Sequence, residues 1–452
     1  MVSGFILSNY ELVIVMSAPA EGGSTSGAST SRPPDVRSAS TAESGLGVAP
    51  RGLSGIKPEV LLAEADKLMP DVIALRRKIH AHPELGNDLP QTRAAVLDAL
   101  NDVAVDVNLS NSTSGGVAVM EGQQPGRTLL LRGDMDALPM PEDTGLPFAS
   151  QHSGRMDACG HDAHTAMLVG AARLLDRHRD KLHGRVTFVC QSGEEGPGGA
   201  EPMVEEGILD VAGRADASFA IHIFPNHHAG HVATRPGALL AAADTVTIKV
   251  RGKGGHGSMP YDALDPVPVA CEIVQALQTF VTRRFNVFDP VVITVGRIVG
   301  GTVDNVIPEM AEIGITLRTF SDSARNTAHE GIRRVASNVA AAHLTEAEVD
   351  IAFGYPSTHN DAAFVDWFCG CAERLLGEEC VSIMPNPLMA AEDFSLILQR
   401  SPGCMAMLGT APAGMEPAEA PPCHSNRMLL NEDAMPNGVA LHAAVALDHL
   451  AG

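Results

Sequence analysis

Four short segments of the chain are rich in side chains that bind metal ions. They are Asp157–His164, Gly193–Gly196, Ile221–Ile223 and Cys423–Ser425. A thiolate, imidazoles and carboxylates together suit borderline-soft divalent cations. The adjacent acids Glu194 and Glu195 can supply both a ligand and a general base. This combination predicts metal-assisted hydrolysis before any other chemistry.

The segment Asp157–His164 carries the densest set of candidate ligands. Cys159 and His161 are two residues apart, which in an extended loop puts both side chains on one side. Asp162 can cap a helix that begins near His164, or it can accept a hydrogen bond from the nitrogen of a ligand imidazole that does not bind the metal. A helix-start loop with an incidental buried cysteine explains the segment equally well when it is taken alone.

The acid pair follows a strand-like run at residues 185–191 and lies in a glycine-rich turn. Open α/β sheets bind ligands at the carboxyl ends of their strands. Neighbouring residues of an extended chain point to opposite sides, so one Glu can face metals and the other can face water. The alternative is a solvated acidic turn.

Other candidates are weaker when each is taken singly. Asp134 and Asp136 follow another apolar strand and can orient ligand imidazoles, whereas direct ligation is less favoured. His222 ends a strand and His424 follows a proline-rich loop, so each could be a satisfied core or loop residue. Glu392 could reach the site or cap the next helix.

Three further polar residues lie in a separate part of the chain. His256 follows glycines in the run Gly252–His256, Asn305 lies in a second glycine-containing turn, and Arg318 lies on a strand. An imidazole, an amide and a guanidinium can bind an oxyanion and a substrate carboxylate. Turn chemistry for the first two and a surface salt bridge for Arg318 are the alternatives.

Helix-like and strand-like apolar patterns along the chain predict the elements that position these residues. Helices are expected over residues 58–80, 92–103, 164–178 and 438–450, and strands over 116–120, 128–132, 185–191 and 218–223. Strands that alternate with helices predict a largely parallel sheet in a three-layer α/β/α catalytic domain. We expect this domain to comprise residues 51–240 and 355–452, after a disordered segment at 1–50 that is poor in large apolar residues.

The segment 241–354 has a different order of elements. Strands are expected at 245–250, 291–299, 311–319 and 348–353, with helices at 266–283 and 323–343. This β-α-β-β-α-β order is the ferredoxin-like split motif. We therefore expect a compact α+β domain inserted into the catalytic domain.

Composition excludes several functions. The formal net charge is −22, from 32 basic and 54 acidic residues, which argues against nucleic acid and anionic membrane surfaces as partners. The eight cysteines are scattered, as expected for reduced thiols in the cytoplasm. The start of the chain lacks the basic residues of a secretory signal, and no stretch is long and apolar enough to span a membrane.

Taken together, the motifs resemble the co-catalytic metallohydrolase family of aminoacylases and carboxypeptidase-G-type enzymes. The branch that they resemble most is that of hippurate hydrolases and plant indoleacetyl-amino-acid hydrolases. The resemblance runs from about Ile56 to the C-terminus. The matching segments are residues 80–85, 132–138, 158–167, 194–200, 252–256, 305–308, 391–395 and 423–425.

The resemblance implies a role for each matching residue. It implies two divalent ions (Zn, Mn, Co or Ni) held by Cys159, His161, Glu195, His222 and His424. It implies that Glu194 is the general base and that His256 stabilises the oxyanion, commonly from the partner subunit of a homodimer formed through the inserted lid domain. Asn305 and Arg318 match residues near the substrate carboxylate.

The implied activity is hydrolysis of the amide bond of N-acyl amino acids by metal-activated water. A metal-dependent dipeptidase or exopeptidase with the same site is the close alternative, and a non-catalytic ligand-binding homologue is a more distant one. The sequence departs from the branch at Asp157, where histidine is usual, at Gln191–Gly193 before the acid pair, and at Gly257, Ser258 and Tyr261. These departures remove no ligand and bear on substrate preference.

Overall fold

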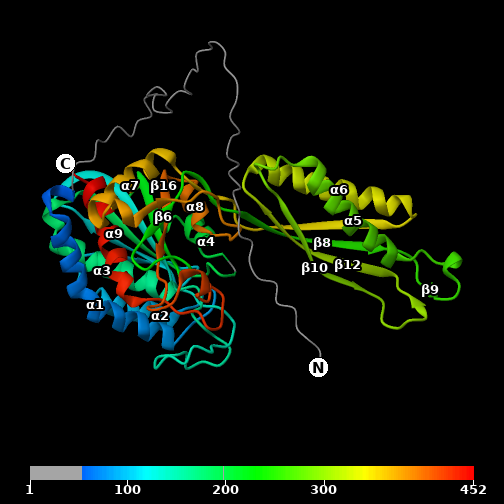
Figure 1. Ribbon diagram of the computed structural model, residues 1–452, viewed down its shortest axis with the longest axis horizontal. Helices are drawn as coiled ribbons and strands as arrows, with labels where there is room; N and C mark the ends of the chain where they lie inside the picture. Colours follow the sequence, from blue (N-terminus) through cyan, green and yellow to red (C-terminus); the bar gives the residue numbers. More distant parts are fainter. Residues whose placement is uncertain (1–52, 197, 452) are drawn as a thin grey trace, which may run out of the picture. The chain divides into compact units, whose positions relative to one another are not determined.

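The computed structural model describes residues 53–196 and 198–451. The segment at 1–50, expected to be disordered, lies outside the described residues. Two separate β-sheets organise the described chain (Figure 1). One has eight strands and contains the segments with candidate metal ligands, and the other has four strands and belongs to the inserted region.

The centre of the eight-stranded sheet is parallel. Its strands β4 (His183–Gln191), β3 (Gln124–Asp134), β5 (Ala217–Phe224) and β16 (Gly403–Gly409) lie side by side in that order. Antiparallel pairs add β2 (Gly116–Glu121) and β1 (Asp106–Leu109) at one edge. At the other edge, β6 (Val232–Thr234) runs antiparallel to β16, and β15 (Val381–Ile383) runs parallel to β6. The mostly parallel sheet agrees with the sequence-based prediction.

Helices cover both faces of this sheet. One face packs against α1 (Pro58–Ala81), α2 (Pro90–Ala99), α3 (His161–Arg177), α7 (Ala362–Leu376) and α9 (Met435–His449). The opposite face packs against the shorter α4 (Ala200–Glu205) and α8 (Phe394–Leu398). Within β3, Leu129 and Leu131 enter the first core and Leu130 enters the second, because successive side chains of a strand point to opposite faces.

The sequence-based assignment omitted β16 and α7. The strand β16 pairs with β5 over its whole length, Gly403 with Ser218 through Gly409 with Phe224. All seven of its residues are buried, as expected for a central strand covered on both faces. The helix α7 begins at a clear cap, because Asp361 accepts the backbone N–H of Phe364 at 2.8 Å.

The inserted region folds as β8 (Ala242–Arg251), α5 (Pro266–Arg284), β10 (Val292–Gly300), β12 (Met310–Thr319), α6 (Asp322–Ala342) and β13 (Glu346–Phe353). Its antiparallel sheet has the order β10-β12-β8-β13, which is the strand order of the split β-α-β motif. The helices α5 and α6 contribute apolar side chains to a core of their own.

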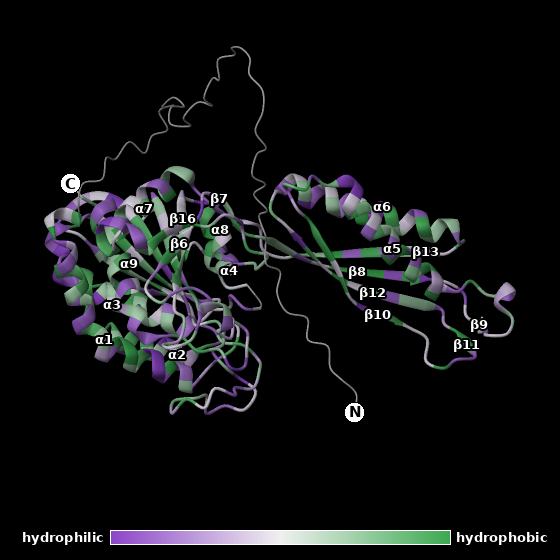
Figure 2. Ribbon diagram, viewed as in Figure 1, coloured by the Kyte–Doolittle hydropathy of each residue, from purple (hydrophilic) through white to green (hydrophobic). Residues whose placement is uncertain are grey.

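Two short strand pairs complete the described fold. The two-residue strands β9 (Gly255–His256) and β11 (Val306–Ile307) pair with each other. They follow the ends of β8 and β10, at the tip of the inserted sheet (Figure 2). In the catalytic region, β7 (Gly237–Leu240) pairs with β14 (Thr358–Asn360), close to the two points where the chain enters and leaves the inserted region.

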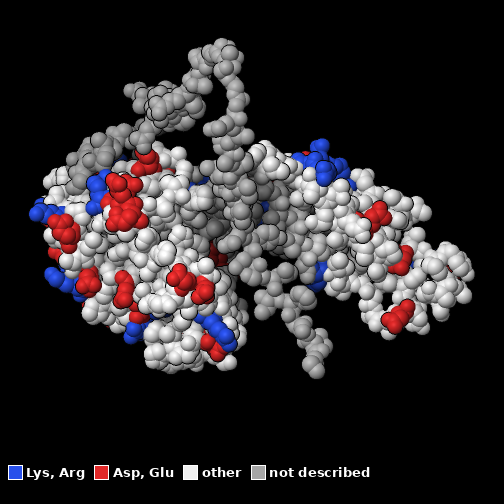
Figure 3. Space-filling view, in the orientation of Figure 1, with Lys and Arg blue, Asp and Glu red and all other residues white. Residues whose placement is uncertain are grey.

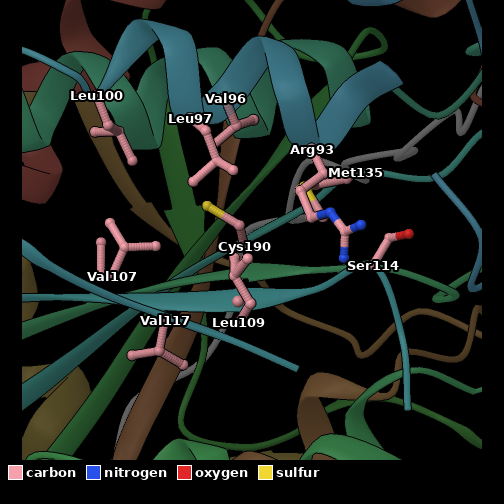
Figure 4. A pocket seen from close by; sticks show the side chains of 12 residues that line it. Arg93, Val96, Leu97, Leu100, Val107, Leu109, Ser114, Val117, Met135 and Cys190 are labelled. Atoms are coloured by element: carbon pink, nitrogen blue, oxygen red, sulfur yellow. The ribbon is translucent and has the colours of Figure 1, made fainter. Parts of the chain in front are cut away.

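A small apolar pocket lies behind the carboxyl end of β3 (Figure 4). Val96, Leu97 and Leu100 of α2 face Met135 and Cys190 across it. Met135 is 2% exposed and lies between Asp134 and Asp136, so apolar packing fixes the backbone that carries both carboxylates.

The charged side chains and the helices of the described chain have two further features. Acidic and basic side chains are interspersed over the face seen in Figure 3. Among the described helices, none has the length and apolar character that crossing a bilayer requires.

Candidate metal centre

The candidate ligands meet at one edge of the eight-stranded sheet. The strands β3, β4 and β5 are parallel, so their carboxyl ends lie at the same edge. Asp134 ends β3, Glu194 and Glu195 follow β4, and His222 lies near the end of β5. The N-terminus of α3 adds His161 at this edge, which is where open α/β sheets bind their ligands.

The loop before α3 is held by Asp157. Its carboxylate accepts the backbone N–H groups of Gly160 and His161 at 3.0 Å and that of Asp162 at 2.8 Å. These are otherwise unpaired donors of the first helical turn. Gly160 has φ of 83°, and a Cβ there would lie 2.4 Å from Cγ1 of Ile223. A tight turn and a cap therefore start α3 at His161, three residues before the start expected from the sequence.

Two imidazoles present Nε2 to the candidate metal centre. His161 donates Nδ1–H to the backbone carbonyl of Asp136 at 2.8 Å, and its Nε2 has no hydrogen-bond partner. His222 donates Nδ1–H to the carbonyl of Ile223 at 2.7 Å, and its Nε2 lies 3.4 Å from Sγ of Cys159. A carbonyl partner on Nδ1 fixes the tautomer in which Nε2 carries a lone pair.

His424 reaches the centre from the loop after β16. Its φ of 67° is in the left-handed region, which non-glycine residues rarely adopt. Its backbone N–H donates to the carbonyl of Ala158 at 2.7 Å, and Nε2 lies 3.1 Å from Oε1 of Glu195. Burial by itself would raise the pKa of Glu195, but the interactions with His424 and His161 hold that pKa below its usual value.

The donor set fits divalent metal ions. Ligand atoms of Cys159, His161 and His222 lie within 4.8 Å of one another, as do those of Cys159, Glu195 and His424. The two groups share Cys159, and together their five residues would hold two divalent ions. The Nε2 atom of His161 and Oε1 of Glu195 are buried without hydrogen-bond partners, which a bound cation would supply.

The thiol of Cys159 must lose its proton to bind metal. The neighbouring Cys423 and burial both raise the pKa of Cys159, and the carboxylates of Glu195 and Glu194 raise it further. A bound cation reverses this balance, because a coordinated thiol is deprotonated.

Glu194 has the properties of an acid–base group. Its side chain is 7% exposed, and Oε2 lies 4.0 Å from Nε2 of His161. Burial raises the pKa of Glu194 well above its usual value, and the carboxylates of Glu392 and Asp393 add to this shift. A bound divalent cation would act in the opposite direction and favour the carboxylate form.

A cleft of about 860 Å³ opens onto these residues. Its wall includes Cys159, Glu194, Glu195, His222 and His424. Arg318 and Thr316 of β12 line it from the inserted region, together with residues 352–355. The volume is that of a small-molecule site.

His256 and Asn305 do not line this cleft within the described chain. They lie at the tip of the inserted region, where β9 pairs with β11. The strand β8 extends ten residues from the catalytic region before this tip, a span of about 30 Å. His256 is exposed there, and Ser258 donates its hydroxyl to Nδ1 of His256 at 2.8 Å.

Residues 130–448 match the model of peptidase family M20/M25/M40. The chain belongs to this family. It is 36% identical to thermostable carboxypeptidase 1 of Saccharolobus solfataricus over 83% of this chain and 94% of the relative. It is also 36% identical to the IAA-amino acid hydrolase ILR1-like 4 of Arabidopsis thaliana over 88% of this chain and 90% of the relative.

Solved structures give the same fold. The YXEP protein of Bacillus subtilis, described as a dinuclear metal-binding peptidase of the M20 family, superposes with a TM-score of 0.74. It is 31% identical, and the match covers 85% of this chain and 99% of that protein. The protein is therefore a metal-dependent hydrolase of the M20/M25/M40 family, as the sequence motifs predict.

In this M20/M25/M40 enzyme, Asp136 supports the centre in a way that differs from the prediction. Its backbone carbonyl orients His161, whereas its carboxylate accepts the backbone N–H groups of Glu194 at 2.8 Å and Glu195 at 3.0 Å. The carboxylate was expected to hold an imidazole. It holds the peptide groups of the acid pair because β4 ends beside β3 in parallel register.

The carboxylate of Asp134 holds a histidine that is not free to bind metal. Its Oδ1 accepts Nδ1–H of His164 at 2.6 Å, and Nε2 of His164 accepts the backbone N–H of Ile223 at 2.8 Å. Both nitrogens of His164 are therefore used inside the protein. The expected bond from Asp134 to a ligand imidazole is absent from the described hydrogen bonds, since Oδ2 of Asp134 lies 3.6 Å from Nε2 of His161.

The prediction for Asp162 agrees with the structure in part. Its Oδ1 accepts the backbone N–H of Ala163 at 2.6 Å in the first turn of α3, although Asp157 holds three other N–H groups there. Its Oδ2 faces α1, where Nδ1 of His80 lies at 2.7 Å and Nε of Arg76 at 3.2 Å. Burial disfavours a charge on His80, yet the hydrogen bonds with Asp162 and Glu142 raise its pKa to about 10. The motif 80–85 pointed to His80, but only the packing of α1 on α3 gives its partner.

Arg132 joins three buried carboxylates behind Glu194. It contacts Asp134, and its NH2 lies 2.9 Å from Glu392 and 3.0 Å from Asp393. Glu392 also accepts the backbone N–H of Phe394, so it both caps α8 and lines the cleft. A buried arginine at a strand end, followed by acids, is the sequence feature from which this network could have been inferred.

Proposed function

We propose that the protein hydrolyses the amide bond of N-acyl amino acids. One observation carries the proposal: the buried carboxylate of Glu194 and the guanidinium of Arg318 line the same cleft, beside the candidate metal ligands. An acid–base group at the metals suits amide cleavage, and a guanidinium suits a substrate carboxylate. The name of the Arabidopsis relative, an IAA-amino acid hydrolase, supports the same substrate class.

In the proposed mechanism, Cys159, His161, His222, Glu195 and His424 hold two divalent ions. When bound, these ions supply Lewis acidity, which lowers the pKa of water and polarises a carbonyl. Glu194 takes the proton of the attacking water on its carboxylate. It then gives that proton to the departing amine of the amino acid.

Arg318 is proposed to bind the carboxylate of the released amino acid. Burial lowers the pKa of its guanidinium, and the nearby carboxylate of Asp244 opposes that shift. An arginine stays protonated at neutral pH after such a shift. Its charge therefore remains available to a substrate anion.

We further propose that the enzyme is a homodimer in which the partner subunit supplies His256. Within one chain, His256 lies beyond the end of β8 and outside the cleft. The strand β10 is a sheet edge with Ile298 and Val299 about half exposed, a surface that can pair with a second copy. His256 would then stabilise the oxyanion of the transition state.

The eight cysteines are free thiols, which supports the cytoplasm as the proposed compartment. A thiol among the candidate ligands likewise favours a reducing environment.

A substrate panel tests the proposed function. Metal-loaded protein is assayed for released amine with acetyl-, benzoyl- and indoleacetyl-amino acids and with free-amine dipeptides. Preference for the acyl-capped compounds supports the proposal. A preference for dipeptides, or for peptides shortened from the C-terminus, would replace it with the peptidase activity that the name of the Saccharolobus relative suggests.

A further inference from the structure

The catalytic carboxylate has few direct contacts with the protein. Among the described hydrogen bonds, Glu194 takes part only through its backbone, and the nearest basic atom to its carboxylate is Nε2 of His161 at 4.0 Å. The position of the carboxylate therefore depends on how firmly the peptide of Glu194 is held. A base must lie within hydrogen-bond reach of the proton that it takes, so this support matters for the rate.

Two groups hold that peptide from opposite sides. Asp136 accepts the backbone N–H of Glu194 at 2.8 Å. The hydroxyl of Tyr355 donates to the backbone carbonyl of the same residue at 2.8 Å. The surrounding turn needs such support, since Gly193 and Gly196 flank the acid pair and leave its backbone free to adopt many conformations.

Tyr355 is itself anchored where the chain leaves the inserted region. Its backbone carbonyl accepts the N–H of Ala243 at 3.0 Å. The preceding Gly354 donates its N–H to Asp244 at 3.0 Å, and His329 lies 2.7 Å from the same carboxylate. The phenol ring thus extends from a fixed backbone to the acid pair, along the wall of the cleft.

The hydroxyl remains a donor at every working pH. Burial raises the pKa of Tyr355, and the carboxylates of Asp393, Glu194 and Glu392 raise it further.

We propose that Tyr355 is a positioning residue for the catalytic base. Its hydroxyl fixes the carbonyl side of the Glu194 peptide, while Asp136 fixes the amide side. The inference rests on the proposed role of Glu194 and does not depend on which acyl group or amino acid is cleaved.

The test compares Tyr355→Phe with Ser357→Ala. The first variant removes only the hydroxyl that reaches Glu194. The second variant removes the hydroxyl of a residue two positions further along the chain. That hydroxyl donates to the carbonyl of Leu240 at 2.9 Å, so the variant also loses one hydrogen bond where the chain leaves the inserted region. Metal content, kcat, KM and the pH profile of kcat are measured for both, with hydrogen exchange of residues 192–200.

We expect Tyr355→Phe to lower kcat about ten- to hundredfold, with KM and metal content close to those of the wild type and faster exchange in the turn. Ser357→Ala should retain wild-type kcat and exchange. Equal kcat in the two variants would overturn the proposal, and so would loss of metal in proportion to activity in Tyr355→Phe.

The two proposals fail in different ways. A wild-type protein that cleaves dipeptides and not N-acyl amino acids contradicts the proposed substrate class, and the same comparison is then made on dipeptides. If the wild type cleaves neither, the proposed function fails, and unchanged exchange in Tyr355→Phe would also overturn the inference.

Discussion

At the scale of single residues, the two adjacent acids have different environments. Glu195 lies against His424 and His161, which hold its pKa low, as a metal ligand requires. Glu194 is buried near Glu392 and Asp393, which raise its pKa, as an acid–base group requires. Both carboxylates lie about equally far from Nε2 of His161, Glu194 at 4.0 Å and Glu195 at 3.9 Å, so their other neighbours make the difference. Environment, and not residue type, separates the two roles.

Replacing Glu194 by Gln should abolish most turnover and leave the metals bound. Glutamine keeps the size of the side chain but cannot take a proton, so kcat should fall by a factor of about 10² to 10⁴. Metal analysis of the purified variant, together with kcat, checks both parts. His222→Ala is the control, since it should lose metal and activity together; a Glu194→Gln enzyme with wild-type kcat would contradict the assignment of the base.

At the scale of elements, the ends of strands and the start of one helix build the centre. Two segments of candidate metal ligands, Asp157–His164 and Gly193–Gly196, stand out in the sequence because each places several candidate ligands within a few residues, whereas His222 and His424 are weak candidates when taken singly. Contacts between side chains that are distant in sequence could not be recognised, because Asp162 meets His80 only through the packing of α1 on α3. The strand β16 was missed because a continuous apolar run has no period that separates a strand from a buried helix.

The helix α3 depends on one carboxylate. Asp157 accepts three backbone N–H groups in the loop that carries Cys159 and His161. Replacing it by Ala should lower the free energy of unfolding of the metal-free protein by about 1–2 kcal/mol, and it should weaken metal binding because the ligand loop loses its support.

Denaturant unfolding and metal titration of Asp157→Ala measure these two effects. Asp157→Asn is the matched control, because its side-chain carbonyl can still accept from the helix terminus. Unaltered metal affinity in Asp157→Ala would show that the loop keeps its conformation without the cap.

The contact between α1 and α3 should make stability depend on pH. The pKa of His80 is about 10 in the folded protein and about 6.5 in an unfolded chain. Because the folded value is the higher one, the protonated imidazole contributes stability that is fully present below pH 6.5 and is lost as pH rises towards 10.

The difference in free energy of unfolding between the wild type and His80→Gln should therefore be largest below pH 6.5 and shrink at alkaline pH. Chemical denaturation of both metal-free proteins across this range gives the measurement. A difference that stays constant with pH would mean that His80 is not charged in the folded protein.

At the scale of the whole molecule, the inserted region contributes to the cleft in two different ways. Arg318 lies near the points where the chain enters and leaves the inserted region, and it lines the cleft of its own chain. His256 lies at the far end of β8, beyond a strand of ten residues. The inserted region therefore places Arg318 in the cleft of its own chain and presents His256 away from it. In a symmetric dimer, each subunit can supply His256 to the other.

Mixing two inactive variants tests this exchange. Glu194→Gln lacks the base and His256→Ala lacks the imidazole, so each homodimer should be nearly inactive. In a mixed dimer with exchange, one site combines the intact Glu194 of one subunit with the intact His256 of the partner subunit and is active. Random assembly of equal amounts makes about half of the dimers mixed, with one active site of two, so about a quarter of wild-type activity should return. If His256 serves its own chain, every site in the mixture lacks one group, and activity should stay at the level of the separate variants. Refolding the two variants together and separately, with gel filtration to confirm dimers, distinguishes these outcomes.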